Sequence, residues 1–314
     1  DMNTIICKRY NSSLASEWDR VVEESRNGTF LFKRNYLDYH SDRFSDHSLM
    51  FELGGEIVAL LPANQKEEVI YSHQGLTYGG VIMTSRCKGA VVLEIFEKMI
   101  GYYRANGIKA IIYKPVPHIY HIKPSEEDIY ALYRYKAELY SCGISSTIDL
   151  TQDISFNSLR TRGVKKALAN NVEIKEEFDF APFWEMLTQN LQQRHSVSPV
   201  HTLKEIEMLR DRFPENIRLY TASQSNELLA GVVIYETATC IHSQYIATSQ
   251  KGRDLSALDL LFLNLIKERY KEYRYFDFGI STESNGDILN NGLLSQKEGF
   301  GATATIYNSY KITL

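Results

Sequence analysis

The sequence lacks the features that would assign it to several protein classes. Its four cysteines, Cys7, Cys87, Cys142 and Cys240, lie far apart, and no C-x-x-C pair indicates a zinc site. No apolar run approaches the roughly 18 residues that cross a bilayer, and none near the N-terminus has the length of a signal peptide. These absences predict a cytoplasmic protein with reduced thiols, no transmembrane segment and no bound metal.

Charge of one sign is also lacking. The net charge is −4 over 314 residues, with 17 basic and 19 acidic side chains in 1–150 and 18 and 20 in 151–314. A general nucleic-acid binder would normally be basic, so no DNA partner is expected. The hydrophobic fraction of 44% is typical of a globular protein. The length of 314 residues is sufficient for one large or two ordinary domains. The 21 tyrosines suit either the walls of a cleft or tyrosine-rich strand surfaces.

Hydrophobic periodicity predicts a similar order of elements in the two halves of the chain. We therefore expect a domain at 1–150 and a second at 151–314. In the first half the pattern predicts strands at 4–9, 48–53, 56–63, 68–73, 108–113 and 140–149, and helices at about 14–26, 88–105 and 125–138. In the second half it predicts helices at about 156–171, 180–193, 203–213 and 257–270, and strands at 217–223, 228–237, 241–248, 274–278 and 302–312.

A β-α-β unit is expected within the second half. The strand at 241–248 leads into a loop, Gln250–Leu255, and then a helix for which Ser256 and Asp259 form a capping box. The strand at 274–278 should pair in parallel with the first. The helix N-terminus would then direct free amides and a partial positive charge toward an anionic ligand. The alternative is an ordinary loop that caps a helix.

The stretch from Tyr275 to Gly301 reads YFDFGISTESNGDILNNGLLSQKEGFG. Asp277 lies in a short aromatic strand, three glycines and an apolar turn follow, and Lys297 precedes a closing Gly-Phe-Gly. Glycine permits positive φ and close approach of a ligand to the backbone. The stretch therefore suggests a binding site, although an irregular crossover with a solvated lysine and a capping aspartate would have the same composition.

This stretch resembles the C-terminal signature of the FemAB-like aminoacyltransferases and of their acetyltransferase relatives. The segment RTRGVKKALANNVEI at 160–174 resembles the opening of their second domain, and TYGG at 77–80 resembles a segment of their first. The resemblance implies an α/β (α+β) fold with tandem GNAT-like domains, each a mixed, mostly antiparallel sheet flanked by helices. It spans nearly the whole chain and is most specific at 275–301.

The resemblance also implies an acyl donor. In GNAT folds the loop before the β-α-β helix binds the pyrophosphate of acyl-CoA, which would assign Gln250, Lys251, Gly252, Arg253 and Ser256 to this co-substrate. This loop has one glycine where the usual acetyl-CoA loop has two. FemAB-like enzymes take their acyl group from aminoacyl-tRNA, so both donors remain open.

Three residues are candidates for catalysis. Lys297 occupies the position of a functionally important lysine in the family signature, where it would stabilise the oxyanion of acyl transfer or bind a donor phosphate. Asp277 would orient or deprotonate an amine, and it would serve equally well as a cap of the glycine crossover. His242 shares a strand face with Gln244 and is a candidate base, against the alternative of a half-exposed strand histidine.

The acceptor would be held by other residues. Basic side chains crowd the segment that opens the second domain, and of these Arg162 and Lys165 are the candidates to bind a diphosphate-linked sugar, with Arg160 and Lys166 beside them. The alternative is a solvated basic helix face. Tyr78 is a candidate wall of the acceptor cleft.

Taken together, the residues and the resemblance predict an N-acyltransferase. It would transfer an acyl or aminoacyl group from acyl-CoA or aminoacyl-tRNA to an amine of a small-molecule or cell-envelope precursor, an amino sugar or a peptidoglycan peptide. No serine or cysteine motif for a covalent intermediate is present, so direct attack by the amine is expected. The alternative is an inactive GNAT-fold module that binds a nucleotide-sugar or a CoA-like ligand.

Overall fold

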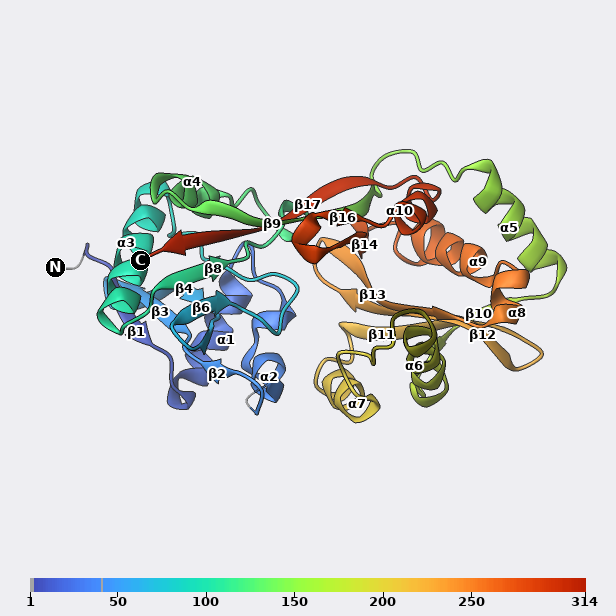
Figure 1. Cartoon of the computed structure of the whole chain (residues 1–314), viewed down its shortest axis with the longest axis horizontal. Coiled ribbons are helices and arrows are strands. Elements are labelled where there is room, and N and C mark those ends of the chain that lie inside the picture. Colours follow the sequence, from blue (N-terminus) through green and yellow to red (C-terminus); the bar gives the residue numbers. More distant parts are fainter. Residues whose placement is uncertain (1–2, 41) are drawn as a thin grey trace. The chain divides into compact units, whose positions relative to one another are not determined.

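The computed structural model describes residues 3–40 and 42–314, which fall into two compact units (Figure 1). The first unit comprises the described residues up to Gly143 together with Thr282–Ile288 and Ile306–Leu314, and the second comprises Ile144–Ser281 and Leu289–Thr305. The chain passes between the units four times: within β9 (Glu138–Asp149), between Ser281 and Thr282, between Ile288 and Leu289, and within β17 (Thr303–Thr313). The units are therefore not contiguous in sequence, and the division into domains at 150 and 151 stays a prediction.

The first unit contains two groups of strands. One sheet has the order β1-β3-β4-β7, and another group has the order β8-β6-β5-β2, with the end of β17 antiparallel to β8. The strands are β1 (Ile6–Arg9), β2 (Ser45–Asp46), β3 (Leu49–Leu53), β4 (Glu56–Leu61), β5 (Asn64–Lys66), β6 (Val69–Ser72), β7 (Ile82–Met83) and β8 (Ala110–Tyr113), with β15 (Thr282–Glu283) paired to β16 (Ile288–Leu289). The helices are α1 (Ala15–Glu24), α2 (Arg34–Leu37), α3 (Gly89–Ala105) and α4 (Glu127–Arg134).

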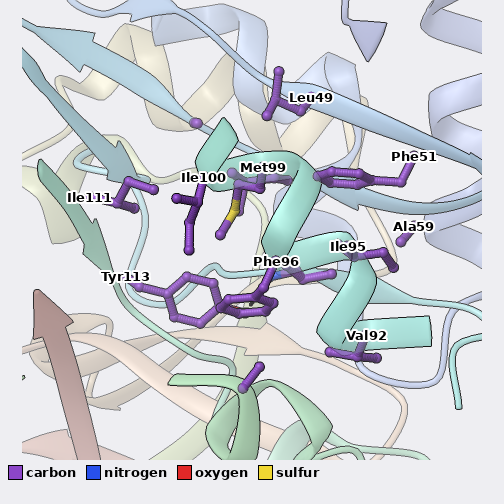
Figure 2. Close-up of a cluster of buried hydrophobic side chains, with 14 of the residues drawn as sticks. Leu49, Phe51, Ala59, Val92, Ile95, Phe96, Met99, Ile100, Ile111 and Tyr113 are labelled. Carbon is purple, nitrogen blue, oxygen red and sulfur yellow. Dashed lines mark hydrogen bonds between the residues drawn. The ribbon is translucent and has the colours of Figure 1, made fainter. Parts of the chain in front are cut away.

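The hydrophobic core of the first unit packs around helix α3. Its apolar residues recur every three or four positions, so they form one stripe along the helix. Figure 2 shows this stripe packed against strands β3, β4 and β8. The buried residues in this view are Leu49, Phe51, Ala59, Val92, Ile95, Phe96, Met99, Ile100, Ile111 and Tyr113.

The second unit is built on a sheet with the order β10-β11-β12-β13-β14-β9, in which only β13 and β14 pair in parallel. Helices α6 and α7 lie on one face of this sheet, and α5 and α9 lie on the other (Figure 1). Its strands are β10 (Glu173–Glu177), β11 (Ile217–Gln224), β12 (Glu227–Glu236), β13 (Cys240–Thr248) and β14 (Tyr275–Ile280). Its helices are α5 (Ser158–Ala169), α6 (Ala181–His195), α7 (Leu203–Arg212), α8 (Gln250–Asp254), α9 (Ala257–Asn264), which continues as a π-turn at Leu265–Arg269, and α10 (Asn291–Glu298).

The β-α-β unit is confirmed, but its connection differs from the expected loop. Residues Gln250–Asp254 form the short helix α8, because the Ser249 side chain accepts a hydrogen bond from the amide of Gly252 and caps it. The predicted capping box at Ser256 is wrong. Ser256 adopts a left-handed conformation and its side chain caps nothing, and Asp259 accepts a hydrogen bond from Arg160 instead.

The apolar turn predicted around Leu293 is also wrong. Residues Asn291–Glu298 form helix α10, which begins where the Asn290 side chain accepts a hydrogen bond from the amide of Leu293. The side chain of Asn290 therefore starts a helix where the glycines of this stretch suggested an irregular chain. As a consequence, Lys297 projects from a helix, which fixes its direction.

Gly252 is required by packing. A Cβ atom at this position would lie 2.1 Å from the carbonyl oxygen of Leu229 and 2.6 Å from Oγ1 of Thr248, so α8 approaches β12 and β13 more closely than a larger residue permits. We expect Gly252→Ala to destabilise the protein by about 1–3 kcal/mol, because backbone must move. In chemical denaturation, the control Gly101→Ala should be neutral or stabilising, since nothing lies within 4 Å of its added Cβ. Equal effects at the two positions would contradict this account.

Candidate functional site

Strands β13 and β14 separate partway along their length. They pair in parallel only over Cys240–His242 and Tyr275–Asp277, and β13 then continues to Thr248. A bulge on β13 leaves Gln244 without a partner on β12, which interrupts the strict alternation that placed His242 and Gln244 on one face. Within the described residues, the last six residues of β13, Ser243–Thr248, thus have no paired strand on the β14 side. An unpaired strand edge offers backbone amides and carbonyls to a ligand.

A cavity of about 370 Å³ lies within the second unit beside this separation. Helices α5, α6, α8, α9 and α10 and strands β13 and β14 all contribute to it. The residues that line it are Arg160, Asn190, Arg194, Ile246, Ala247, Thr248, Gly252, Arg253, Ser256, Leu258, Asp259, Phe262, Phe278, Leu293, Gln296, Lys297 and Phe300. The β-α-β connection and the C-terminal signature therefore meet at one site, although most of helix α9 and the π-turn after it separate them in sequence.

The cavity is electropositive. The Arg160 guanidinium donates a hydrogen bond of 2.7 Å from Nη1 to Oδ1 of Asp259 and lies 5.5 Å above the ring of Phe300. Burial raises the pKa of Asp259 to about 6, although the ion pair with Arg160 opposes this. Desolvation and the nearby Arg194 lower the pKa of Arg253. The cavity therefore suits an anionic ligand.

A row of buried polar side chains crosses the sheet of the second unit. His242 of β13 pairs in register with Asp277 of β14, which pairs with Thr147 of β9. Oδ1 of Asp277 accepts hydrogen bonds from Oγ of Ser145 at 2.7 Å and Oγ1 of Thr147 at 2.8 Å, and Oδ2 lies 2.9 Å from Nδ1 of His242. Thr147 also lies 2.8 Å from the hydroxyl of Thr305.

This row fixes the orientation of His242. An ionised carboxylate only accepts hydrogen bonds, so Nδ1 of His242 carries the proton and donates to Asp277, which leaves Nε2 as an acceptor. About 10% of the His242 side chain remains accessible. Cε1 lies 3.5 Å from the position that a Cβ of Gly279 would take, so the imidazole borders the backbone at the end of β14. The arrangement can accept a proton.

Lys297 is nearly buried, with 6% of its surface exposed, and it lines the cavity. Its Nζ donates to the carbonyl oxygens of Gly279 at 3.0 Å and Ile280 at 3.1 Å and to Oγ of Ser281 at 3.0 Å. An ammonium has three protons, so all of them are used within the protein. Desolvation lowers the pKa of Lys297 to about 8, although Asp277 opposes this shift.

The five residues assigned to acyl-CoA divide into two groups. Gly252, Arg253 and Ser256 line the cavity, whereas Gln250 and Lys251 do not. The amide of Gln250 donates to Asp254 at 3.0 Å, and Lys251 forms an ion pair of 2.9 Å with Glu227 on the exposed surface. The glycine of this segment serves the packing of α8 against the sheet.

The residues assigned to the acceptor are not brought to this cavity. Arg162 and Lys165 are exposed on α5, and neither lines it. Tyr78 belongs to the first unit, where it is buried and its hydroxyl lies 3.1 Å from Oγ1 of Thr29. Their roles in acceptor binding stay predictions.

Sequence reasoning underrated one cavity residue and missed another. Arg160, which was only a neighbour of the preferred Arg162, is the α5 cation that reaches the cavity. Arg194 was overlooked, because it lies at the end of α6 beyond the predicted helix. Its spacing from Asn190 is the signal that was available, since residues four apart share a helix face.

The described residues hold neither a metal-binding cluster nor a membrane-spanning helix. Among residues 3–40 and 42–314, no group of three or more His, Cys, Asp or Glu side chains is placed to hold a metal ion. Over the same residues, no helix combines the length and the apolar character needed to cross a bilayer. Each of the four cysteines is a free thiol.

Comparison with known proteins places the site in a known fold. Residues 160–285 match the family model of the acetyltransferase (GNAT) domain. FemX has a TM-score of 0.70 at 12% identity, over 98% of this chain and 97% of that chain. The C-terminal domain of a protein from Agrobacterium fabrum named as a lysylphosphatidylglycerol synthetase has a TM-score of 0.62 at 11% identity, over 97% and 92%. A tandem GNAT protein from the clavulanic acid biosynthesis pathway has a TM-score of 0.50 at 11% identity, over 98% of each chain.

The fold and the family match define a GNAT-type acyltransferase domain in the second half of the chain. The chain as a whole has a fold similar to that of FemX and of a tandem GNAT protein, which is the tandem arrangement that its motifs predicted. A search of curated protein sequences returned no match. The mixed, mostly antiparallel sheet flanked by helices is confirmed.

Proposed function

We propose that this protein is an N-acyltransferase that transfers an acyl or aminoacyl group to an amine of a cell-envelope precursor. The observation that carries the proposal is the convergence at the separation of β13 and β14. An unpaired strand edge and a cationic cavity lie there. The imidazole of His242 does not line this cavity, but a buried carboxylate holds it on β13 where the pairing with β14 ends. These are the parts that acyl transfer to an amine needs: a place for the donor, charge stabilisation and a base.

In the proposed reaction the neutral amine attacks the donor carbonyl directly. The nitrogen–carbon bond forms as the carbonyl oxygen gains negative charge, and His242 Nε2 accepts the proton that the amine loses. The tetrahedral intermediate then collapses, the bond from carbon to the thiolate or ribose oxygen breaks, and the leaving group takes up a proton. Asp277 holds the imidazole in the tautomer that this requires.

Lys297 would act through its charge and through the backbone that it holds. Its three protons are bound to Gly279, Ile280 and Ser281, so a direct hydrogen bond to the oxyanion would require one of these to be exchanged. Its positive charge in a desolvated site favours negative charge at the reacting oxygen without such an exchange. We therefore assign to Lys297 an electrostatic and positioning role.

For the donor we favour acyl-CoA, with aminoacyl-tRNA as the second candidate. Arg253 and Arg194 line the cavity near enough for Arg194 to lower the pKa of Arg253, which suits a diphosphate better than a single charge. The N-terminus of α9 has no side-chain cap, so its first amides remain available to an anion. The edge of β13 suits an extended arm with amide groups, such as pantetheine.

The acceptor is proposed from the similar proteins and from the prediction made from the motifs. One similar structure is the C-terminal domain of a protein named as a lysylphosphatidylglycerol synthetase. We propose an amine of an envelope precursor, an amino sugar or a peptidoglycan peptide, and a cytoplasmic site of action. Acyl transfer to such amines from radiolabelled donors, followed by mass spectrometry of the product, would identify the acceptor.

The donor assignment predicts different roles for two neighbouring cations of α8. Arg253→Ala is expected to weaken coenzyme A binding about tenfold in calorimetry, because Arg253 lines the cavity. Lys251→Ala is the matched control and should leave binding within about twofold, since Lys251 is paired with Glu227 outside the cavity. Equal losses in the two variants would contradict the assignment of this cavity to the donor.

Binding without transfer would favour the alternative function. The segment of α8 has one glycine where the usual acetyl-CoA loop has two. This glycine, Gly252, lets α8 pack closely against the sheet. A protein that binds a CoA-like ligand or a nucleotide-sugar but transfers nothing to any envelope amine would be a GNAT-fold binding module. The transfer assay and the calorimetry above together separate the two functions.

A further inference from the structure

The apolar part of the cavity wall is preformed. Phe278 and Phe300 are stacked with their ring centroids 5.5 Å apart, and Phe262 meets the two rings edge-on at 5.1 and 5.2 Å. All three side chains are at least 96% buried, so they are held in place before any ligand arrives. Ile246, Leu258 and Leu293 extend this surface. An apolar group placed against it gains hydrophobic stabilisation with no loss of side-chain freedom.

The charged groups that line the cavity are nearly all cations. They are Arg160, Arg194, Arg253 and Lys297. In the described chain, the one carboxylate that lines the cavity is Asp259, and its Oδ1 already accepts from Arg160 at 2.7 Å. A cationic ligand group would therefore meet four like charges, and the carboxylate that could pair with it is already occupied.

We infer that the group this site transfers has an uncharged, apolar side chain, and that donors carrying a basic side chain are rejected. The inference rests on the proposed function, because it concerns the acyl part of the donor. It separates this chain from a lysyl transferase, even though a protein named as a lysylphosphatidylglycerol synthetase shares its fold. The three phenylalanines accommodate the apolar side chain, and Lys297 repels a terminal ammonium.

Two thioesters of nearly equal shape test the inference. Butyryl-CoA and β-alanyl-CoA differ in having a terminal methyl or a terminal ammonium, so their comparison isolates charge. Calorimetry with the intact protein should show that butyryl-CoA binds more tightly than coenzyme A, and that β-alanyl-CoA binds at least tenfold more weakly than butyryl-CoA. In the Lys297→Met variant this difference should shrink. Equal or tighter binding of β-alanyl-CoA by the unaltered protein overturns the inference.

The second donor class extends the test. If no CoA thioester binds, RNA microhelices that carry the acceptor-stem end and are charged with leucine or lysine replace them. Preferential binding and transfer of leucine supports the inference, and equal or preferential use of lysine overturns it while leaving acyl transfer intact. Binding of neither donor class removes the proposed function, and the inference with it.

Discussion

Replacement of His242 by asparagine is expected to lower kcat by roughly 10²–10⁴-fold while the protein remains folded. Asparagine places an N–H donor close to the position of Nδ1, so the hydrogen bond to Oδ2 of Asp277 can be kept. The variant lacks Nε2, which is the atom that would accept the amine proton. The loss should therefore appear in the chemical step, and KM should change little.

The pH profile distinguishes a base from a structural histidine. If His242 is the base, the pH profile of kcat/KM should differ between the unaltered protein and the His242→Asn variant. Asp277→Asn is the companion variant, because it keeps the side-chain shape but allows the imidazole to adopt the wrong tautomer. A His242→Asn variant that keeps more than half of the activity and the same pH profile would remove His242 from the mechanism.

Replacement of Lys297 by methionine is expected to lower kcat by about 10²–10³-fold. The change removes the buried positive charge and leaves the acceptors at Gly279, Ile280 and Ser281 without their donor. Both effects act at the backbone where β14 ends. The control is Lys251→Met, which removes an exposed cation on the other side of α8 and should retain activity.

The Lys297→Met variant also tests how the unfolding free energy depends on pH. The pKa of Lys297 in the folded protein is about 8, below its ordinary value of 10.5, because burial disfavours the charged form. Between these values the unfolded chain binds a proton that the folded chain has released, so the unfolding free energy rises with pH. Relative to Lys297→Met, the unaltered protein should gain on the order of 2 kcal/mol between pH 7 and 9.5.

Denaturant titrations at the two pH values measure this difference. The comparison with the variant cancels the contribution of other titrating groups, including Lys114, whose pKa burial also lowers to about 8. A difference that is independent of pH would show that Lys297 keeps its proton throughout, and that its ammonium is better compensated than its burial suggests.

The sequence by itself determined the architecture of the second half. The strands at 217–223, 228–237 and 241–248 were read from uninterrupted apolar and alternating patterns and are present as β11, β12 and β13. The helix predicted at about 203–213 is present as α7, and its capping box at Thr202 and Glu205 follows from the sequence because both of its hydrogen bonds are local. Asp277, His242 and Lys297 were nominated from their positions in strands and in the glycine-rich signature.

Only the tertiary structure decided how these residues are connected. The pairing of His242 with Asp277 depends on the register of two strands, and the two residues are 35 positions apart in sequence. Their partners Ser145 and Thr147 come from β9. Arg160, and not Arg162, reaches the cavity because α5 packs against α9, where Arg160 forms an ion pair with Asp259. The local sequence pattern predicts neither the strand register nor the helix contact. Both are set by the burial of apolar faces that lie far apart in sequence.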